Sequence, residues 1–161
     1  MKAASIQHKE LIEDIGMGIE ERAGLSPLAS RIYALLTMTS YDGLTFDEIK
    51  ESIEASKSSI SVNIKVLLQL RYIEYYTKPG DRKRYFKVSK YFQIKFLEIY
   101  MDALEKQITL VDKINNYNKE FQKEKFVNEE SLGLITRDYL TKMRDLVAVT
   151  IAKIAEFKTT E

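Results

Sequence analysis

A stretch of 35 residues from Tyr91 to Lys125 contains neither proline nor glycine. Its apolar residues recur at alternating intervals of four and three positions, as Leu97, Met101, Leu104, Ile108 and Val111. This heptad-like spacing predicts a single helix with one continuous apolar seam. At 1.5 Å per residue such a helix would be about 50 Å long, more than a compact small domain needs. The chain is therefore expected to extend a long helix that packs along another.

A break at 126–128 is expected to separate this helix from a final one. Asn128, together with Glu129 and Glu130, is the predicted N-terminal cap, and the final helix should run to about Phe157. A helical hairpin within one chain would cover part of the apolar seam, whereas a two-fold dimer would bury it more completely. The length of the helix favours a homodimer.

The composition limits the fold class. The 161 residues include only six glycines and two prolines. A β-sandwich needs a turn every eight to twelve residues, so these few turn residues exclude that class and favour a mostly helical protein. Apolar residues make up 45% and charged residues 30% of the chain, which excludes a wholly disordered protein.

Local capping signals place the helices of the first half. A helix over 6–23 should stop at Gly24, and Ser26 followed by Pro27 is a typical helix start. Thr45 and Glu48 match a capping box, and Ser56 is the expected cap of the next helix. The last two helices are separated by about three residues, which is the spacing of a helix-turn-helix.

After Arg71 the pattern changes from helical to strand-like. Residues 72–77 and 85–88 are rich in aromatic and β-branched side chains, and Pro79-Gly80-Asp81 between them predicts a turn. A hairpin directly after a helix-turn-helix is the arrangement called a winged helix. The predicted fold class is therefore mainly α, with an N-terminal packing or dimerisation helix over 1–24, a winged helix-turn-helix domain with a β-hairpin wing over 25–90, and long C-terminal dimerisation helices over 91–161.

The net charge of +1 conceals an uneven distribution. From Ser56 to Lys90 there are nine basic residues and two acidic ones, so this segment carries +7 and the remainder −6. Because attraction depends on local potential, such a segment indicates a localised surface for a polyanion. A solvated charged face is the alternative reading of charge alone.

The helix predicted over 57–71 has two distinct sides. Ile60, Ile64 and Leu67 centre on one side, which should be buried, while the opposite side carries short polar groups and one long cation. Short hydroxyl groups can approach base edges or phosphates, a lysine can reach phosphate or guanine, and a valine can contact a thymine methyl. The candidate DNA-contacting residues on this helix and its cap are Ser56, Lys57, Ser58, Ser59, Ser61, Val62 and Lys65.

The tip of the predicted hairpin adds further cations. Arg82, Lys83 and Arg84 follow the turn and Lys78 precedes it, where a wing would meet the DNA backbone or minor groove. Asp81 is expected to orient a neighbouring arginine through a bidentate ion pair. A charged hairpin can also serve only to keep a sheet edge soluble. The helix over 57–71, which would read the bases, is followed along the chain by this basic tip. The two features in this order favour double-stranded DNA as the partner.

Other function classes lack the residues that they need. The chain has no cysteine and one histidine, His8, so we expect no cofactor, no metal site and no catalytic constellation. No apolar run approaches the length of a membrane span, which predicts a soluble, cytoplasmic protein without a membrane partner. The alternative to a DNA-binding regulator is a winged-helix module for protein–protein assembly, in which the basic segment meets an acidic partner.

Ordered motifs over about residues 10–90 resemble the GbsR-like branch of the MarR superfamily of bacterial transcriptional regulators. They include Pro27-Leu28-Ala29-Ser30-Arg31-Ile32-Tyr33, Leu44-Thr45-Phe46-Asp47-Glu48-Ile49, Ala55-Ser56-Lys57-Ser58-Ser59-Ile60-Ser61 and Lys78-Pro79-Gly80-Asp81-Arg82-Lys83-Arg84-Tyr85-Phe86. The resemblance implies a winged-helix homodimer that binds a (pseudo)palindromic operator. It also implies that the terminal helices of both subunits form the interface.

A small-molecule effector is the least defined expectation. The resemblance implies that some relatives respond to small molecules, and the ligand-binding residues of this chain are unknown. Aromatic residues around Tyr91 and Tyr100 could form a cage for a cation, but most such residues belong to a core. If an effector exists, we expect it between the winged domain and the long helices, where binding could change the spacing of two reading helices.

Overall fold

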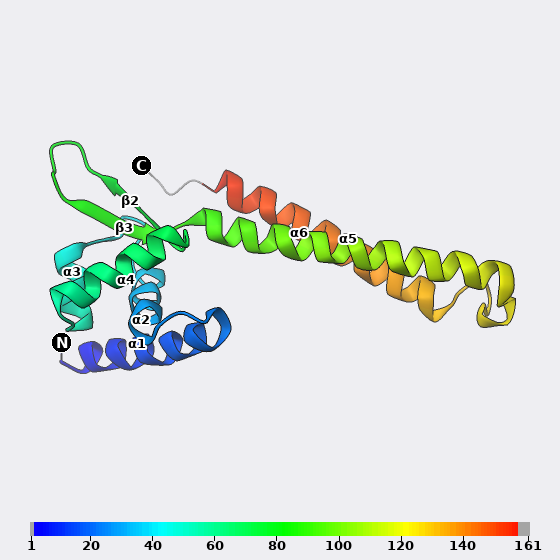
Figure 1. Cartoon of the computed structure of the whole chain (residues 1–161), viewed down its shortest axis with the longest axis horizontal. Coiled ribbons are helices and arrows are strands. Elements are labelled where there is room, and N and C mark those ends of the chain that lie inside the picture. The colour runs from blue at the N-terminus through cyan, green and yellow to red at the C-terminus, as the bar shows by residue number, and fades with distance from the viewer. Residues whose placement is uncertain (1, 158–161) are drawn as a thin grey trace. The chain divides into compact units, whose positions relative to one another are not determined.

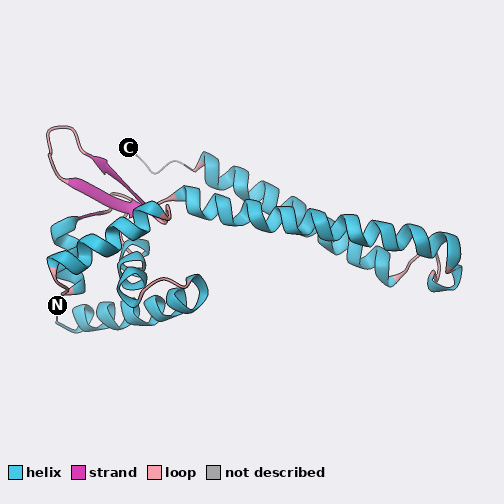
Figure 2. Cartoon of the chain, in the orientation of Figure 1, coloured by secondary structure: helices cyan, strands magenta, loops and turns pink. Residues whose placement is uncertain are grey.

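The computed structural model describes residues 2–157, and side chains from Ile6 onwards. The chain divides after Phe92 into two compact units. The elements follow one another along the chain (Figures 1 and 2) as α1 (Lys2–Ala23), α2 (Pro27–Thr37), β1 (Leu44–Thr45), α3 (Phe46–Ile53), α4 (Lys57–Gln69), β2 (Ile73–Thr77), β3 (Arg84–Val88), α5 (Lys90–Phe121), a 3₁₀ turn η1 (Lys123–Lys125) and α6 (Leu132–Glu156). The predicted class, mainly α with a hairpin wing, is confirmed.

The first unit is built around α2, which packs against α1, α3, α4 and β3. Ile32 of α2, Ile49 of α3 and Ile60 of α4 are completely buried in this core. Ser26 begins α2 and accepts a hydrogen bond from Ala29 N, with Pro27 in the first turn, as predicted. The capping box of Thr45 and Glu48 and the Ser56 cap of α4 are also confirmed.

A polar group in this core lacks a hydrogen-bond partner among the described residues. The Ser30 side chain is fully buried, and its Oγ forms no hydrogen bond with any residue that the structure describes. A buried hydroxyl without a partner destabilises the folded state, because the unfolded chain can donate the same group to water.

The sheet has three antiparallel strands in the order β1-β3-β2. Tyr75 pairs with Phe86 and Tyr76 with Tyr85, which fixes the register of the wing. The two-residue strand β1 was not predicted from the sequence. Leu44 lies opposite Phe86 in the ladder, and Gly43 just before it adopts a left-handed φ of 68°. A Cβ atom at Gly43 would lie 2.1 Å from the carbonyl oxygen of Phe86, so glycine is required for β1 to reach β3.

The second unit is an antiparallel pair of helices, α5 and α6 (Figure 1). Leu104 and Ile108 of α5 pack with Leu140 and Val147 of α6, and an ion pair joins Asp112 to Arg137 on one flank. The other seam residues of α5, Leu97, Met101 and Val111, pack against the same cluster. The helical hairpin within one chain therefore buries the centre of the predicted seam at Leu104 and Ile108, and leaves its other residues half-buried.

The connection between the two helices differs from the prediction. Helix α5 ends at Phe121 rather than near Lys125, and η1 follows it. The expected cap at Asn128 is wrong, because Asn128 and Glu129 have positive φ angles of 51° and 67° and form a left-handed turn. The cap is Ser131, whose extended backbone lets its side chain accept a hydrogen bond from Leu134 N.

Near this connection a polar side chain lies inside the hairpin. Asn115 is 3% exposed and continues the apolar seam of α5 by one heptad step. Its amide oxygen occupies the space over Gly133 of α6, where a Cβ atom would lie only 1.9 Å from it. Neither amide atom forms a hydrogen bond within the described part of the chain.

No helix between Lys2 and Glu156 is both long enough and apolar enough to span a lipid bilayer.

Candidate nucleic-acid interface

Helix α4 is held in place by its buried apolar side and by hydrogen bonds near its N-terminus. Ile60, Ile64 and Leu67 are buried in the core of the first unit. Ser26, the cap of α2, also donates a hydrogen bond of 2.6 Å to the Asn63 side chain. Asn63 in turn donates to the carbonyl of Ser59, so the N-terminus of α2 is tied to the first turns of α4.

The opposite side of α4 is open, as its periodicity predicts. Val62 is 62% exposed, and the neighbouring polar side chains Ser58, Ser61 and Lys65 are exposed as well. The hydroxyl of Ser56 lies 2.8 Å from that of Ser59 and 3.1 Å from that of Ser58, so a cluster of hydroxyl groups covers the helix N-terminus. Lys57 extends from the same turn into solvent. This surface is shallow and polar, with donors, acceptors and two cations.

The turn between α3 and α4 is fastened to the N-terminal helix. Glu54 ends α3 in a left-handed conformation with φ of 56°. Its carboxylate forms a 2.6 Å ion pair with Lys9 of α1, and Glu13 of α1 forms another with Arg31 of α2. The Arg31 guanidinium lowers the pKa of Glu13 by hydrogen bonding to it. The N-terminal helix therefore braces the helix-turn-helix from behind.

The cations of the hairpin fall into two groups. Arg82 and Lys83 at the tip are exposed, and neither takes part in an ion pair or ring contact with the residues described. Lys78 and Arg84 lie against aromatic rings: the Lys78 ammonium is 4.3 Å from the centroid of Tyr85, and the Arg84 guanidinium 4.7 Å from that of Tyr75.

Asp81 does not orient an arginine, which corrects the expectation from sequence. Its carboxylate accepts a hydrogen bond from the backbone N–H of Lys83 at 2.9 Å and another from the Tyr85 hydroxyl at 2.7 Å. These bonds stabilise the ionised form, so the pKa of Asp81 lies below its ordinary value. The same carboxylate raises the pKa of the Tyr85 hydroxyl. Strand alternation explains the difference, because Tyr85 and Arg84 point to opposite faces of β3.

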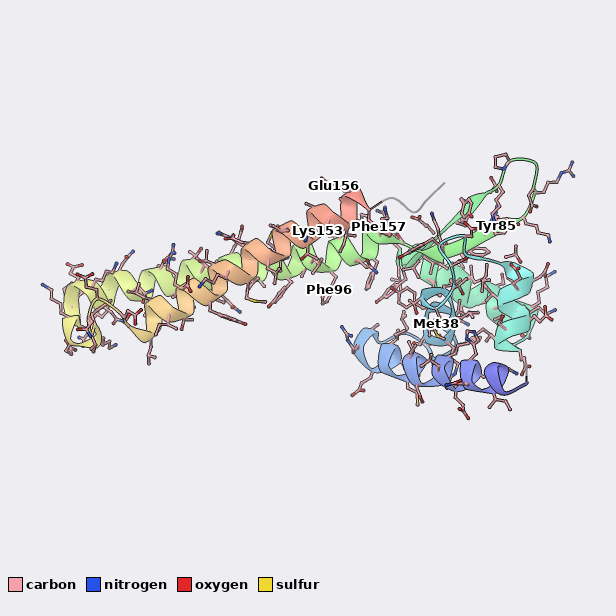
Figure 3. The ribbon with its side chains drawn as sticks, turned by 180° about the vertical axis from the view of Figure 1, so that it is seen from behind. Met38, Tyr85, Phe96, Lys153, Glu156 and Phe157 are labelled. Carbon is pink, nitrogen blue, oxygen red and sulfur yellow. The ribbon has the colours of Figure 1, made fainter. Side chains whose placement is uncertain are left out.

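The structure adds residues that the sequence reading did not single out. Asn63 positions α4, and Tyr76 donates a hydrogen bond of 2.9 Å to the carbonyl of Asp42. Tyr85 lies on the wing, where Figure 3 labels it. Alternation along the two strands places Tyr76 and Tyr85 on the face opposite the buried Phe86, and this signal was available in the sequence.

Of the aromatic residues that suggested a cation cage, those nearest the wing have local partners, whereas Tyr100 is exposed on α5. Phe92 stacks on Tyr72 with 3.8 Å between the ring centroids, and Arg71 covers the ring of Tyr91. Phe86 is buried in the core. Among the described residues no three acidic, histidine or cysteine side chains are grouped so that they could hold a metal ion.

Comparison with known proteins agrees with this geometry. Residues 30–108 match the family model described as a winged helix DNA-binding domain. This segment has the winged helix fold of that family and is similar to it in sequence. The chain is also similar to the HTH-type transcriptional regulator MmpR5 of Mycobacterium tuberculosis, with 32% identity over 79 residues. The match covers 49% of this chain and 47% of that regulator, so the chain spans about half the length of this relative.

Two solved structures are similar to this chain, and one of them supports the fold. A crystal structure of a transcriptional regulator aligns with 92% of this chain and 97% of its own, at 23% identity and a TM-score of 0.51. The adhesin competence repressor AdcR of Streptococcus pyogenes aligns with 88% of this chain and 96% of its own, at 20% identity and a TM-score of 0.39. The first of these two alignments indicates that the chain shares its fold with that structure.

Proposed function

We propose that this chain is a transcriptional regulator, not an enzyme, and that it binds double-stranded DNA through its winged helix domain. The observation that carries the proposal is the exposed polar side of α4, where Ser58, Ser61, Val62 and Lys65 share one surface. A helix of this kind fits the major groove, with small side chains close to base edges and a lysine within reach of phosphate or guanine.

The wing extends the proposed contact. Arg82 and Lys83 at its tip would neutralise phosphates or enter the minor groove. The hydroxyl groups and N–H groups at the start of α4, with Lys57, would bind a backbone phosphate. In this proposal residues 25–90 form the DNA-binding part.

We further propose that the regulator acts as a homodimer on a (pseudo)palindromic operator. Beyond the seam that the hairpin buries, α5 carries a second apolar stripe, about 120° around the helix, which is exposed. Helix α6 also carries an exposed apolar stripe, which is offset from its buried residues in the same rotational direction as the stripe of α5. Because the helices are antiparallel, both stripes lie on the same side of the hairpin. The exposed stripe residues are Phe96, Ile99, Tyr100, Leu110, Ile114, Tyr117 and Phe121 of α5, and Leu132, Ile135, Tyr139, Leu146, Val149 and Phe157 beside them.

An apolar face of this extent is typical of a protein–protein interface rather than of a free surface. A second copy related by a two-fold axis would cover it and would present two reading helices to one duplex. In this proposal residues 91–161 form the dimer, with the helix over 1–24 beside the winged domain or in the interface. Membership of the GbsR-like branch and a response to a small-molecule effector remain predictions from the motif resemblance.

The test measures fluorescence anisotropy with a palindrome selected by the protein from random duplexes, and with a scrambled duplex, across a salt series. Each phosphate contact releases counterions, so log Kd should rise steeply with log salt, by about 0.9 per contact. Arg82→Ala should weaken binding to both duplexes and reduce this slope by about one contact. Ser61→Ala or Val62→Ala should change the preference among operator variants by about 1–3 kcal/mol with little effect on the slope.

A protein–protein assembly module would give a different result. Its basic face would bind the selected and scrambled duplexes equally at about 150 mM salt, and the helix variants would leave the preference unchanged. That outcome would reject the regulator and favour the assembly module.

A further inference from the structure

The loop at the tip of the wing is closed by hydrogen bonds of its own. Asp81 N donates to the carbonyl of Lys78 at 3.0 Å, and the Asp81 carboxylate accepts from Lys83 N and from the Tyr85 hydroxyl. Gly80 takes the left-handed φ of 79° that this turn needs. The backbone on both sides of Arg82 is therefore fixed, while the Arg82 side chain points into solvent.

The closed tip is in turn fastened to the body of the winged domain. The Lys78 ammonium lies over the Tyr85 ring and 3.6 Å from the carboxylate of Asp42. The Tyr76 ring lies 5.7 Å from the Tyr85 ring, and its hydroxyl donates to the Asp42 carbonyl. Asp42 belongs to the turn that leads into β1, so the contacts run from the tip of the wing to the base of the sheet.

Resting on the DNA-binding function proposed above, we propose that Tyr85, Asp81 and Lys78 are positioning residues. They hold the tip of the wing in its DNA-binding conformation before DNA arrives. Lys78 acts through this cluster, whereas Arg82 and Lys83 contact the DNA.

The physical basis is the entropy of the loop. A flexible tip must be ordered when it binds, and the free energy lost in ordering is subtracted from the affinity. Hydrogen bonds and ring contacts formed during folding remove that loss at the binding step. The ammonium of Lys78 already has a carboxylate within ion-pair distance and a ring as partners, so a phosphate would have to displace them. Among the described residues, no carboxylate lies within ion-pair distance of Arg82 or Lys83, and the Lys83 charge acts on Asp81 and Glu48 only from further away.

The decisive variant is Tyr85→Phe, which removes one hydroxyl and keeps the ring under Lys78. Its matched control is Tyr75→Phe on the opposite face of the hairpin, since the Tyr75 hydroxyl forms no hydrogen bond with the described residues. In the free protein, Tyr85→Phe should increase the hydrogen-exchange rate of the Lys83 amide by about fivefold, and Tyr75→Phe should leave it unchanged. Equal exchange in both variants would overturn the proposal without any use of DNA.

DNA binding supplies the second measurement, with the same duplex and salt series as above. Tyr85→Phe and Lys78→Ala should each weaken binding about fivefold or more with an unchanged salt slope, because the number of phosphate contacts stays the same. Arg82→Ala should weaken binding and reduce the slope. A reduced slope for Lys78→Ala, or wild-type affinity for Tyr85→Phe, would overturn the proposal. If the wild-type protein shows no salt-dependent binding, the proposed function fails, and the exchange rates still decide whether the cluster orders the tip.

Discussion

The carbonyl oxygen of Phe86 occupies the space that a side chain at position 43 would need. Gly43 and Gly24 have similar left-handed φ angles of 68° and 63°. They differ in their surroundings, because apart from the adjacent residues no atom lies within 4 Å of a Cβ placed at Gly24. Substitutions at these two glycines therefore distinguish the cost of backbone strain from the cost of a steric clash.

We expect Gly24→Ala to lower the free energy of unfolding by about 1 kcal/mol, the usual penalty for a left-handed alanine. Gly43→Ala should lower it by more than about 2 kcal/mol, because it adds a clash with the backbone of β3 to the same strain. Urea denaturation followed by circular dichroism measures both values. Equal losses in the two variants would show that β1 can move away from β3 at little cost.

Among the elements, α3 has the N-terminus that neighbouring residues cap most completely. The Thr45 hydroxyl accepts from Glu48 N, and the Glu48 carboxylate accepts from the hydroxyl and the N–H of Thr45. These hydrogen bonds hold the pKa of Glu48 below its ordinary value. Since the folded-state pKa is lowered, this contribution to stability is present above the pKa of an unfolded glutamate, and it is lost as the pH falls through the lowered value.

Thr45→Ala should therefore lower the free energy of unfolding by about 1 kcal/mol at neutral pH and raise the pKa of Glu48 towards its ordinary value. Denaturation across pH 3–7 and an NMR titration of the Glu48 carboxyl measure the two effects. Ser131→Ala is the control, because Ser131 caps α6 without a carboxylate partner at the third position. Its loss should be similar in size and independent of pH over this range.

In the α5–α6 pair, one substitution is expected to raise the free energy of unfolding rather than lower it. Asn115→Leu keeps the branched shape that fits over Gly133 and removes two buried polar atoms that have no partner among the described residues. We expect it to raise the free energy of unfolding by about 1 kcal/mol or more. Thermal unfolding measures the change, and a lower midpoint would show that the Asn115 amide has a partner in the assembled protein.

How far the sequence predicts these elements depends on the range of the interactions that form them. The caps at Ser26, Thr45 and Ser56 could be predicted because each one uses groups within three positions of itself. Strand β1 could not, since it is defined by the pairing of Leu44 and Thr45 with a distant part of the chain. The Asn128 cap was wrong because the residue type suits both a cap and a left-handed turn, and the backbone takes the turn.

The candidate interface shows the same division. The exposed side of α4 follows from helical periodicity, and the basic tip of the wing follows from the order of the motifs. The partner of Asp81 was assigned to an arginine because sequence proximity does not say which face of a strand a side chain occupies. Some cations of the hairpin point into solvent and others lie against tyrosine rings. Which ones contact a ring depends on how β2 pairs with β3, and the sequence of either strand alone does not reveal that pairing.

For the molecule as a whole, the exposed apolar stripes predict its oligomeric state. We expect the wild-type chain to sediment as a dimer at micromolar concentration without DNA. Leu110→Lys places a charge in the stripe of α5, since Leu110 is 59% exposed there, and it should produce monomers. The control is Thr109→Lys, because Thr109 is adjacent to Leu110 and exposed but lies on the other side of α5. This variant should remain dimeric. Sedimentation velocity separates the two, and a well-behaved wild-type monomer would reject the dimer.

The unpartnered hydroxyl of Ser30 has a consequence for how long the protein survives in a cell. Proteases degrade the small fraction of molecules that is unfolded at any moment, and 1 kcal/mol changes that fraction about fivefold. Ser30→Ala removes the destabilising group and leaves the fully buried backbone in place, so it should stabilise the first unit by about 1 kcal/mol. In a pulse-chase experiment the variant should be degraded several-fold more slowly than the wild type. Its steady-state abundance, and with it the occupancy of any site that it binds, would then rise without a change in a single contact at the binding surface.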